Sequence, residues 1–213
     1  MKAQRKQARL NGQVRLSEIY REAARIIREK GYDATSMSEI ADAVGITKAG
    51  VYHHVTGKQD LLFAIMSYGL DSLENEVITP AKAISDAEQR LQAIIISHSR
   101  LITEHSMAKG NPVTIVIDEV AGLTPAHRRK IDQRKRAYVD LVRGTLKQLK
   151  EEGKLRNVDV TVAAFSLFGM ILWLSRWYHP GGPLSSEQVA DEVSKIAMAG
   201  LLLPQSAFSQ PLD

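Results

Sequence analysis

The sequence predicts an all-α protein of about nine helices, and three observations support this fold class. Glycine and proline are scarce, at 14 and 7 of 213 residues, so few points interrupt regular structure. The stretches between them repeat apolar residues every three or four positions, as in a helix with one buried face. Serine, threonine and aspartate precede these stretches, where they can cap helices. With 44% hydrophobic and 24% charged residues, the chain can bury a core and is not expected to be disordered.

The first three predicted helices form a short unit around a tight turn. Apolar spacing predicts the first helix over 16–30. Ser36 has a glutamate three residues later, the spacing of a capping box, and opens a second helix that ends at Gly45. Thr47 is a credible N-cap for a third helix that reaches about His54. Two helices separated by so short a glycine turn are typical of a helix-turn-helix unit.

Six further helices are expected after this unit. Thr124-Pro125 and Asp159 have the residue types of helix starts, and Ser185 with Gln188 has the spacing of a second capping box. Helical spacing places the six at 58–79, 85–106, 113–121, 125–152, 159–178 and 186–202. A domain boundary is expected at the start of the helix from Lys58, so that this helix would couple the two domains mechanically.

The positive charge is concentrated in the first quarter of the chain. Residues 1–58 hold eleven Lys and Arg against six Asp and Glu, while the remainder holds 17 against 18. This distribution is expected if the first quarter meets a polyanion, although a solvated basic tail would look the same. The arm side chains Lys2, Arg5, Lys6 and Arg9 are candidates for phosphate or minor-groove contacts, or else belong to a disordered arm.

Several classes of protein are excluded or disfavoured. The chain has no cysteine, which rules out disulfides, thiolate zinc sites and a cysteine nucleophile, and which fits a reducing cytoplasm. The basic N-terminus lacks the apolar stretch of a secretory signal, and the stretch VAAFSLFGMILWLSRWY is interrupted by Arg176, so no membrane partner is expected. Motifs for a serine hydrolase, a phosphate-binding loop and a zinc protease are missing, so we expect no enzyme, no metal and no cofactor.

The stretch ITKAGVYHHVTGKQDL carries the residues expected to contact DNA. The second helix of a helix-turn-helix enters the major groove with its N-terminal residues toward the bases. Gly50 in a helix costs up to ~1 kcal/mol relative to alanine, which close approach to DNA or dense helix packing would explain. The candidate DNA contacts are Thr35, Ser36, Thr47, Lys48, Ala49, Gly50, Tyr52, His53, His54 and Lys58.

The adjacent His53 and His54 allow four interpretations. Metal ligands on a helix prefer positions four apart, because adjacent residues point about 100° apart. A catalytic base needs a cleft and an orienting carboxylate, and this short polar helix offers neither. Simple surface histidines and histidines that contact nucleic acid remain, and the latter fits the helix-turn-helix best.

A family resemblance rests on these same residues. The apolar pattern from Ala23 to Tyr32, Gly45 at the turn and Tyr52-His53-His54 at the end of the third helix resemble the DNA-binding domain of the TetR family of transcriptional regulators. The resemblance covers 16–64 and departs at Val55, where the family commonly has phenylalanine. It implies a homodimer whose two recognition helices enter successive major grooves of a double-stranded, near-palindromic operator.

The resemblance also implies two domains with separate functions. We expect a helix-turn-helix DNA-binding domain with a basic arm over 1–57 and a ligand-binding and dimerisation domain over 58–213. The last two helices are expected to pair with their twofold mates as a four-helix bundle. The candidate interface residues are Leu167, Ile171, Leu174, Val189, Val193 and Ile196.

A ligand pocket is suggested by the stretch MILWLSRWYHPGGPLSSEQVADE. Its Met and Trp residues share one helical stripe, which fits either pocket lining or packing in a core or dimer interface. The stretch resembles the end of a TetR subgroup that answers to acyl-CoA thioesters in fatty-acid or steroid catabolism. The phosphates of CoA need clustered Arg and Lys, as in the helix from Pro125, although that helix could equally be a solvated face. The candidate ligand residues are His98, Arg128, Arg134, Met170, Trp173, Arg176 and Trp177, with His98 either orienting a carbonyl or purely structural.

The expected function is therefore a cytoplasmic repressor that a hydrophobic effector, favoured to be an acyl-CoA, releases from its operator. A repressor of the same family that senses drug-like compounds is one alternative. An architectural DNA-binding protein without an effector is a second, although the large apolar domain argues against it.

Overall fold

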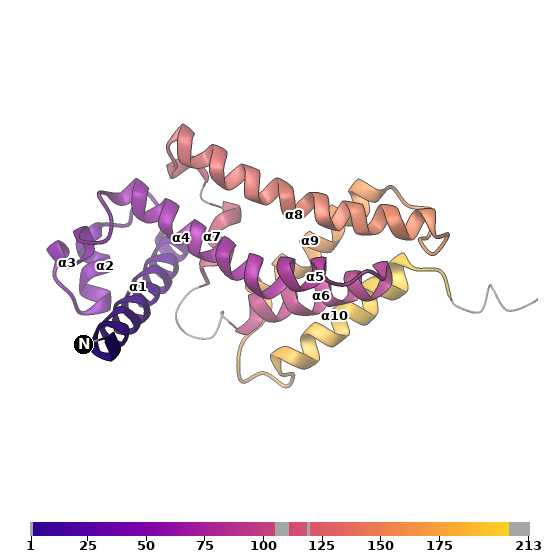
Figure 1. Cartoon of the computed structure of the whole chain (residues 1–213), viewed down its shortest axis with the longest axis horizontal. Helices are drawn as coiled ribbons and strands as arrows, with labels where there is room; N and C mark the ends of the chain where they lie inside the picture. Colours follow the sequence, from indigo (N-terminus) through magenta and orange to yellow (C-terminus); the bar gives the residue numbers. More distant parts are fainter. Residues whose placement is uncertain (1, 105–110, 119, 205–213) are drawn as a thin grey trace, which may run out of the picture. The chain divides into compact units, whose positions relative to one another are not determined.

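The computed structural model describes residues 2–104, 111–118 and 120–204 (Figure 1). Among these residues the regular elements are helical, apart from one isolated β-bridge between Leu155 and Leu202, and the all-α prediction is confirmed. The chain divides into two compact units, one of residues 1–72 with 105–134 and one of residues 73–104 with 135–213. The functional boundary expected at Lys58 stays a prediction, because compactness alone does not assign function.

The first unit is organised around α1, which packs against α2 and α7. Its buried apolar side chains come from every helix of the unit and include Ile19, Ile40, Val51, Leu62, Ile65, Met66 and Ile115. Its elements are α1 (Lys2–Lys30), α2 (Met37–Val44), α3 (Lys48–Tyr52), α4 (Lys58–Leu73), α7 (Pro112–Asp118), the 3₁₀ turn η2 (Val120–Gly122) and the first turns of α8 (Pro125–Glu151).

The second unit is organised around α6, which packs against α9, α10 and η1 (Figure 1). Its core includes Leu91, Ile94, Ile95, Ile102, Leu146, Ala164, Ile171 and Val189, all buried. Its elements are η1 (Glu74–Ile78), α5 (Thr79–Lys82), α6 (Ala87–Glu104), the remainder of α8, α9 (Val160–Trp177) and α10 (Ser186–Leu201).

Helix starts follow the capping residues expected from the sequence. Asp159 accepts hydrogen bonds from the first backbone N–H groups of α9. Thr124 accepts one from the His127 N–H at the start of α8. Ser185 and Gln188 form a complete capping box on α10. These side chains satisfy backbone donors that have no partner inside the helix.

Two helices differ most from the expected bounds. α1 begins at Lys2 and not near residue 16, since no proline interrupts the Lys-, Arg- and Gln-rich segment before it. The helix from Lys58 was expected to end at Thr79-Pro80, but α4 passes into one π-helical turn and then into α5. Pro80 has no N–H to donate, and the Thr79 N–H beside it bonds to the carbonyl of Glu74, five residues back.

α9 is long and apolar enough to cross a bilayer by length and composition, although Arg176 was expected to interrupt this stretch. Its 18 residues have a mean hydropathy of 1.5, and 39% of them are buried inside the structure. Arg176 lies near its end and does not lower the average below that of a membrane span. The buried side packs on α6 and α10, as in the core helix of a helical domain.

Candidate nucleic-acid interface and ligand site

The turn between α2 and α3 has the geometry of a helix-turn-helix. Gly45 ends α2 in the left-handed conformation, with φ 68° and ψ 37°, which only glycine adopts without strain. Thr47 then caps α3 by accepting the Gly50 N–H at 3.0 Å. Val51 is completely buried and fixes α3 to the core of the unit. One face of α3 is thus held against α2, and the opposite face is directed to solvent.

The exposed face of α3 carries most of the residues expected to contact DNA. Tyr52 is 44% exposed, although it is large and apolar. Thr47, Lys48, Ala49, His53 and His54 are exposed as well, and Gly50 is half-buried. A shallow depression of about 570 Å³ runs along this face, lined by Ile19, Gly45, Ile46, Thr47, Gly50, His53 and His54. This surface supplies donors, a cation and an aromatic hydroxyl, which suits phosphates and base edges.

Three of the expected DNA contacts have structural roles. Thr35 is 2% exposed and donates its hydroxyl to the Gly31 carbonyl at 2.9 Å, so it closes the end of α1 and does not face solvent. Ser36 caps α2 by accepting the Glu39 N–H. Lys58 donates to a backbone carbonyl, that of Asp33, at 3.1 Å. Its charge also lies 4.4 Å from the centre of the Tyr32 ring.

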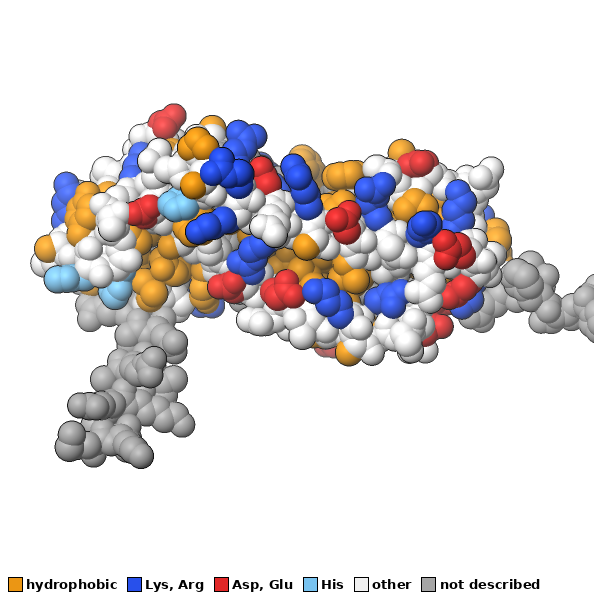
Figure 2. Space-filling view, turned by 45° about the horizontal axis from the view of Figure 1, so that its top comes forward, with side chains coloured by type: hydrophobic (Ala, Val, Ile, Leu, Met, Phe, Trp, Pro, Cys, Tyr) orange, Lys and Arg blue, Asp and Glu red, His pale blue; other side chains and the backbone are white. Residues whose placement is uncertain are grey.

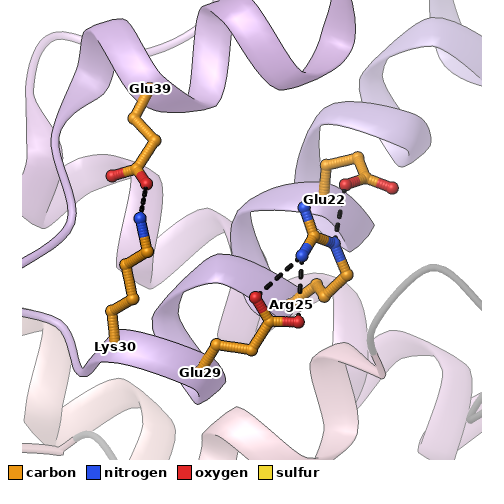
Figure 3. Close-up of polar contacts among 5 residues, drawn as sticks. All are labelled: Glu22, Arg25, Glu29, Lys30 and Glu39. Atoms are coloured by element: carbon orange, nitrogen blue, oxygen red, sulfur yellow. Dashed lines mark hydrogen bonds and ion pairs between the residues drawn. The ribbon is translucent and has the colours of Figure 1, made fainter.

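Ion pairs join side chains within α1 and connect α1 to α2 (Figure 3). Arg25 bridges Glu22 and Glu29 along α1. Glu39 pairs with Lys30 of α1, which lowers the pKa of that carboxyl, and no return bond from Glu39 to Ser36 completes the expected capping box. Such exposed pairs add little stability, so they mainly orient α2 on α1.

Replacing Gly50 by alanine should separate stability from DNA binding. A methyl group there would lie 3.4 Å from Thr47 Oγ1 and 3.7 Å from Ile46 Cβ, which is ordinary contact. We therefore expect stability in urea to stay the same or rise by less than about 1 kcal/mol. Operator affinity should fall on the order of tenfold, because the added methyl group separates the helix from the DNA. Unchanged affinity in a fluorescence anisotropy titration would show that the α3 backbone does not approach DNA closely.

The residues expected in a ligand pocket do not gather in one place. His98 is 2% exposed and lies in the second unit on α6. Its Nδ1 is 3.0 Å from the hydroxyl of Tyr138 on α8, which is also buried. Burial lowers the pKa of His98 to about 4 and raises that of Tyr138, so both side chains are neutral near pH 7. Sequence reasoning missed Tyr138, although it continues the apolar stripe of α8 through Ile131 and Val142.

The buried His98 predicts a pH dependence of stability. Its pKa is about 4 in the folded protein and 6.5 for an unperturbed histidine, so the unfolded chain binds the proton more readily. The contribution of neutral His98 to the free energy of unfolding is complete above pH 6.5. It is lost as the pH falls toward 4, by at most about 1.4 kcal/mol per pH unit. Urea denaturation at pH 7 and pH 5 measures this loss. His98→Leu should show a smaller loss, and an equal loss in both proteins would contradict the assignment.

The two arginines expected to bind CoA phosphates lie in the first unit. Arg134 makes an ion pair with Asp71 of α4 at 2.8 Å and donates to the Ser67 carbonyl at 3.3 Å. Arg128 is exposed and lies 3.7 Å from Asp132, one turn along α8. Figure 2 shows basic and acidic side chains interleaved over the surface. These contacts favour the interpretation that the basic side chains of α8 are balanced by acidic neighbours. Arg134 in addition links α8 to α4 through its ion pair with Asp71.

On α9 the burial of two faces is opposite to the expectation. Leu167, Ile171 and Leu174, expected at a dimer interface, are at most 4% exposed within a single chain. Met170, Trp173 and Trp177, expected in a pocket, are 37%, 64% and 49% exposed and lie on the outer face. Arg176 is exposed beside them. The predicted helical period is confirmed, but periodicity alone does not decide which stripe of α9 faces α6.

α10 divides in the same way. Val189 and Val193, expected at the interface, are buried in the chain, whereas Ile196 is 62% exposed. Phe165 and Val162 of α9, which sequence reasoning did not select, are 57% and 64% exposed. The exposed large apolar side chains of these two helices are Val162, Phe165, Met170, Trp173 and Trp177 of α9 and Ile196 of α10, and this set is called the outer apolar face below. So much exposed aromatic surface is typical of a protein–protein interface.

A capped helix-turn-helix with an exposed second helix, together with a larger helical unit, defines a helix-turn-helix regulator with a separate effector domain. Residues 19–65 match the bacterial regulatory proteins of the tetR family, and residues 85–201 match the tetracyclin repressor-like C-terminal domain. The chain belongs to the TetR family of transcriptional regulators.

Individual relatives share most of the chain. The HTH-type transcriptional repressor KstR2 of Mycobacterium tuberculosis is 31% identical over 202 residues, which are 91% of this chain and 96% of the relative. The fatty acid metabolism regulator protein of Bacillus subtilis is 23% identical over 72% of this chain and 78% of its own. A crystal structure of AibR in complex with isovaleryl coenzyme A and operator DNA is 42% identical, with a TM-score of 0.75 over 85% of this chain and 97% of that one.

Proposed function

We propose that this TetR-family regulator is a cytoplasmic repressor that binds a near-palindromic operator as a homodimer and is released by an acyl-CoA thioester. It acts by binding and catalyses no reaction. The observation that carries the proposal is the 42% identity with AibR, which has been crystallised with both isovaleryl coenzyme A and operator DNA. The exposed face of α3, with Lys48, Tyr52 and His53, supports the DNA-binding part independently.

The homodimer is proposed to form through the outer apolar face of α9 and α10. A twofold axis through this face would place each exposed aromatic side chain against the same face of the partner. Burial of several large apolar side chains is the main source of free energy for such an interface. Two α3 helices held in a fixed relation could then enter successive major grooves, about one helical turn apart.

Release from DNA follows from linkage between the two binding events. A ligand that binds more tightly to the conformation unable to span both half-sites lowers operator affinity by that difference. Couplings of this kind are typically 1–3 kcal/mol, or about 5- to 150-fold in affinity. The thioester needs no contact with DNA for this effect.

Fluorescence anisotropy on the DNA fragment upstream of the chain's own gene tests the proposal. Titrations are made with acetyl-, isovaleryl-, octanoyl- and palmitoyl-CoA, with free CoA and with the free acids. We expect one or more thioesters to weaken binding about 5- to 150-fold and the free acids to have no effect. Tight DNA binding that no thioester weakens would support the operator part of the proposal and contradict the proposed effector. Failure to bind the fragment specifically would contradict the operator part.

A further inference from the structure

The buried pair of His98 and Tyr138 has a fixed geometry. The Tyr138 hydroxyl oxygen lies 3.0 Å from Nδ1 of His98, with the two rings nearly perpendicular and their centres 5.5 Å apart. The Tyr138 ring is in turn 5.3 Å from the ring of Phe168 on the inner side of α9. Three helices of the second unit therefore hold the imidazole in one orientation.

The position of the imidazole proton follows from this geometry. The neutral phenol of Tyr138 has one proton to donate, and within the described residues its hydroxyl bonds to Nδ1 of His98. We assign Tyr138 as the donor and Nδ1 as the acceptor, because the opposite arrangement would leave both the phenol proton and Nε2 without a partner among the described residues. The single proton of the neutral ring is then on Nε2. Tyr138 thus acts through His98 by selecting its tautomer.

The Nε2–H group of His98 is buried and has no hydrogen-bond partner within the described residues. The hydroxyls of Ser99 and Ser194 are also buried without a partner. A helical serine can rotate its hydroxyl toward the backbone carbonyl one turn earlier, but an imidazole Nε2 cannot reach its own backbone. Because buried donors are nearly always satisfied, His98 is expected to have an acceptor outside the described residues.

The surroundings of His98 restrict the chemistry of this acceptor. Ile94, Leu101 and Ile102 lie one helical turn away on either side along α6, and all are buried. The described residues make no ion pair to the imidazole, and the ring of Tyr138 lies edge-on to it. A carboxylate or phosphate in such surroundings would lack a counter-charge, whereas a neutral carbonyl on an apolar group would be accommodated.

We propose that Nε2–H of His98 donates a hydrogen bond to the thioester carbonyl oxygen of the effector, with Tyr138 as the residue that positions the donor. This inference rests on the proposed function, because it names a polar contact of the same acyl-CoA. The site should therefore bind a thioester more tightly than the matching thioether, because the methylene group of the thioether cannot accept the hydrogen bond from His98. We expect a preference of roughly 10- to 100-fold for one buried donor left unpaired.

The experiment has one arm without ligand and one with ligand, both on the full-length dimer. Nitrogen-15 NMR of the imidazoles at pH 7 identifies the His98 tautomer, with His98→Leu providing the assignment. Calorimetric titration then compares isovaleryl-CoA with its S-(3-methylbutyl) thioether analogue. We expect the Nε2–H tautomer and the thioester preference in the wild-type protein. His98→Leu should bind both ligands with nearly equal affinity.

Two further variants make the result specific. Tyr138→Phe keeps the ring packing but removes the proton donor, so it should populate both tautomers and reduce the thioester preference. Ser99→Ala removes a neighbouring buried hydroxyl from the same helix and should leave the preference unchanged. An Nδ1–H tautomer in the wild type, or the same preference in wild type and His98→Leu, would overturn the inference. Failure of the wild type to bind any thioester of the panel would contradict the proposed function itself.

Discussion

Replacing Trp173 by glutamate is expected to convert the dimer into a monomer and to lower operator affinity on the order of 100-fold or more. Trp173 is 64% exposed and lies at the middle of the outer apolar face of α9. In the proposed symmetric dimer the substitution would put two carboxylates into one apolar interface, where neither has a counter-ion. A monomer offers one recognition helix per molecule and loses the second half-site. Sedimentation equilibrium and anisotropy on the operator fragment measure the two effects.

The same substitution should leave the fold of the single chain intact. Because most of the Trp173 side chain contacts solvent, the free energy of unfolding of the monomer should change by no more than about 0.5 kcal/mol. Gln92→Glu, which places the same charge at an exposed position of α6, is the matched control and should remain dimeric. A dimeric Trp173→Glu protein with wild-type affinity would show that this face is not the interface.

Replacing Gly69 by alanine is expected to destabilise the first unit by about 1–3 kcal/mol through overpacking. A methyl group on Gly69 of α4 would lie 2.7 Å from the carbonyl carbon of Pro112 and 2.8 Å from its oxygen. These are backbone atoms at the start of α7, so α7 must move away from α4 to make room. The higher helix propensity of alanine, about 1 kcal/mol, offsets only part of this cost.

Gly144→Ala is the matched control for this experiment. Gly144 also lies inside a helix, α8, but an added methyl group would meet no atom within 4 Å. Its stability should therefore rise by up to about 1 kcal/mol from propensity alone. Urea denaturation followed by circular dichroism compares the two variants. If Gly69→Ala is as stable as Gly144→Ala, α7 does not pack tightly on α4 in solution.

Local patterns in the sequence were sufficient for most of the helices and for the exposed residues of α3. The cap of α3 at Thr47 and the turn at Gly45 depend on interactions between residues a few positions apart. Such interactions are the same in any fold that contains the segment, so sequence reasoning can find them. Residues whose role differs from the expectation also make local interactions, but two such interactions can compete. The Thr35 hydroxyl, for example, can face solvent or close a helix end, and it does the latter.

What the sequence by itself determined is the fold class, the helix-turn-helix and the periodicity of each amphipathic helix. Only the tertiary structure decided which stripe of α9 is buried, that Arg134 pairs with Asp71, and that Tyr138 lies against His98. The α9 helix is apolar on nearly all sides, so its periodicity is compatible with either face turned inward. The choice is made by the shape of α6 and α10, because a close-packed core accepts one set of side chains and leaves the other exposed.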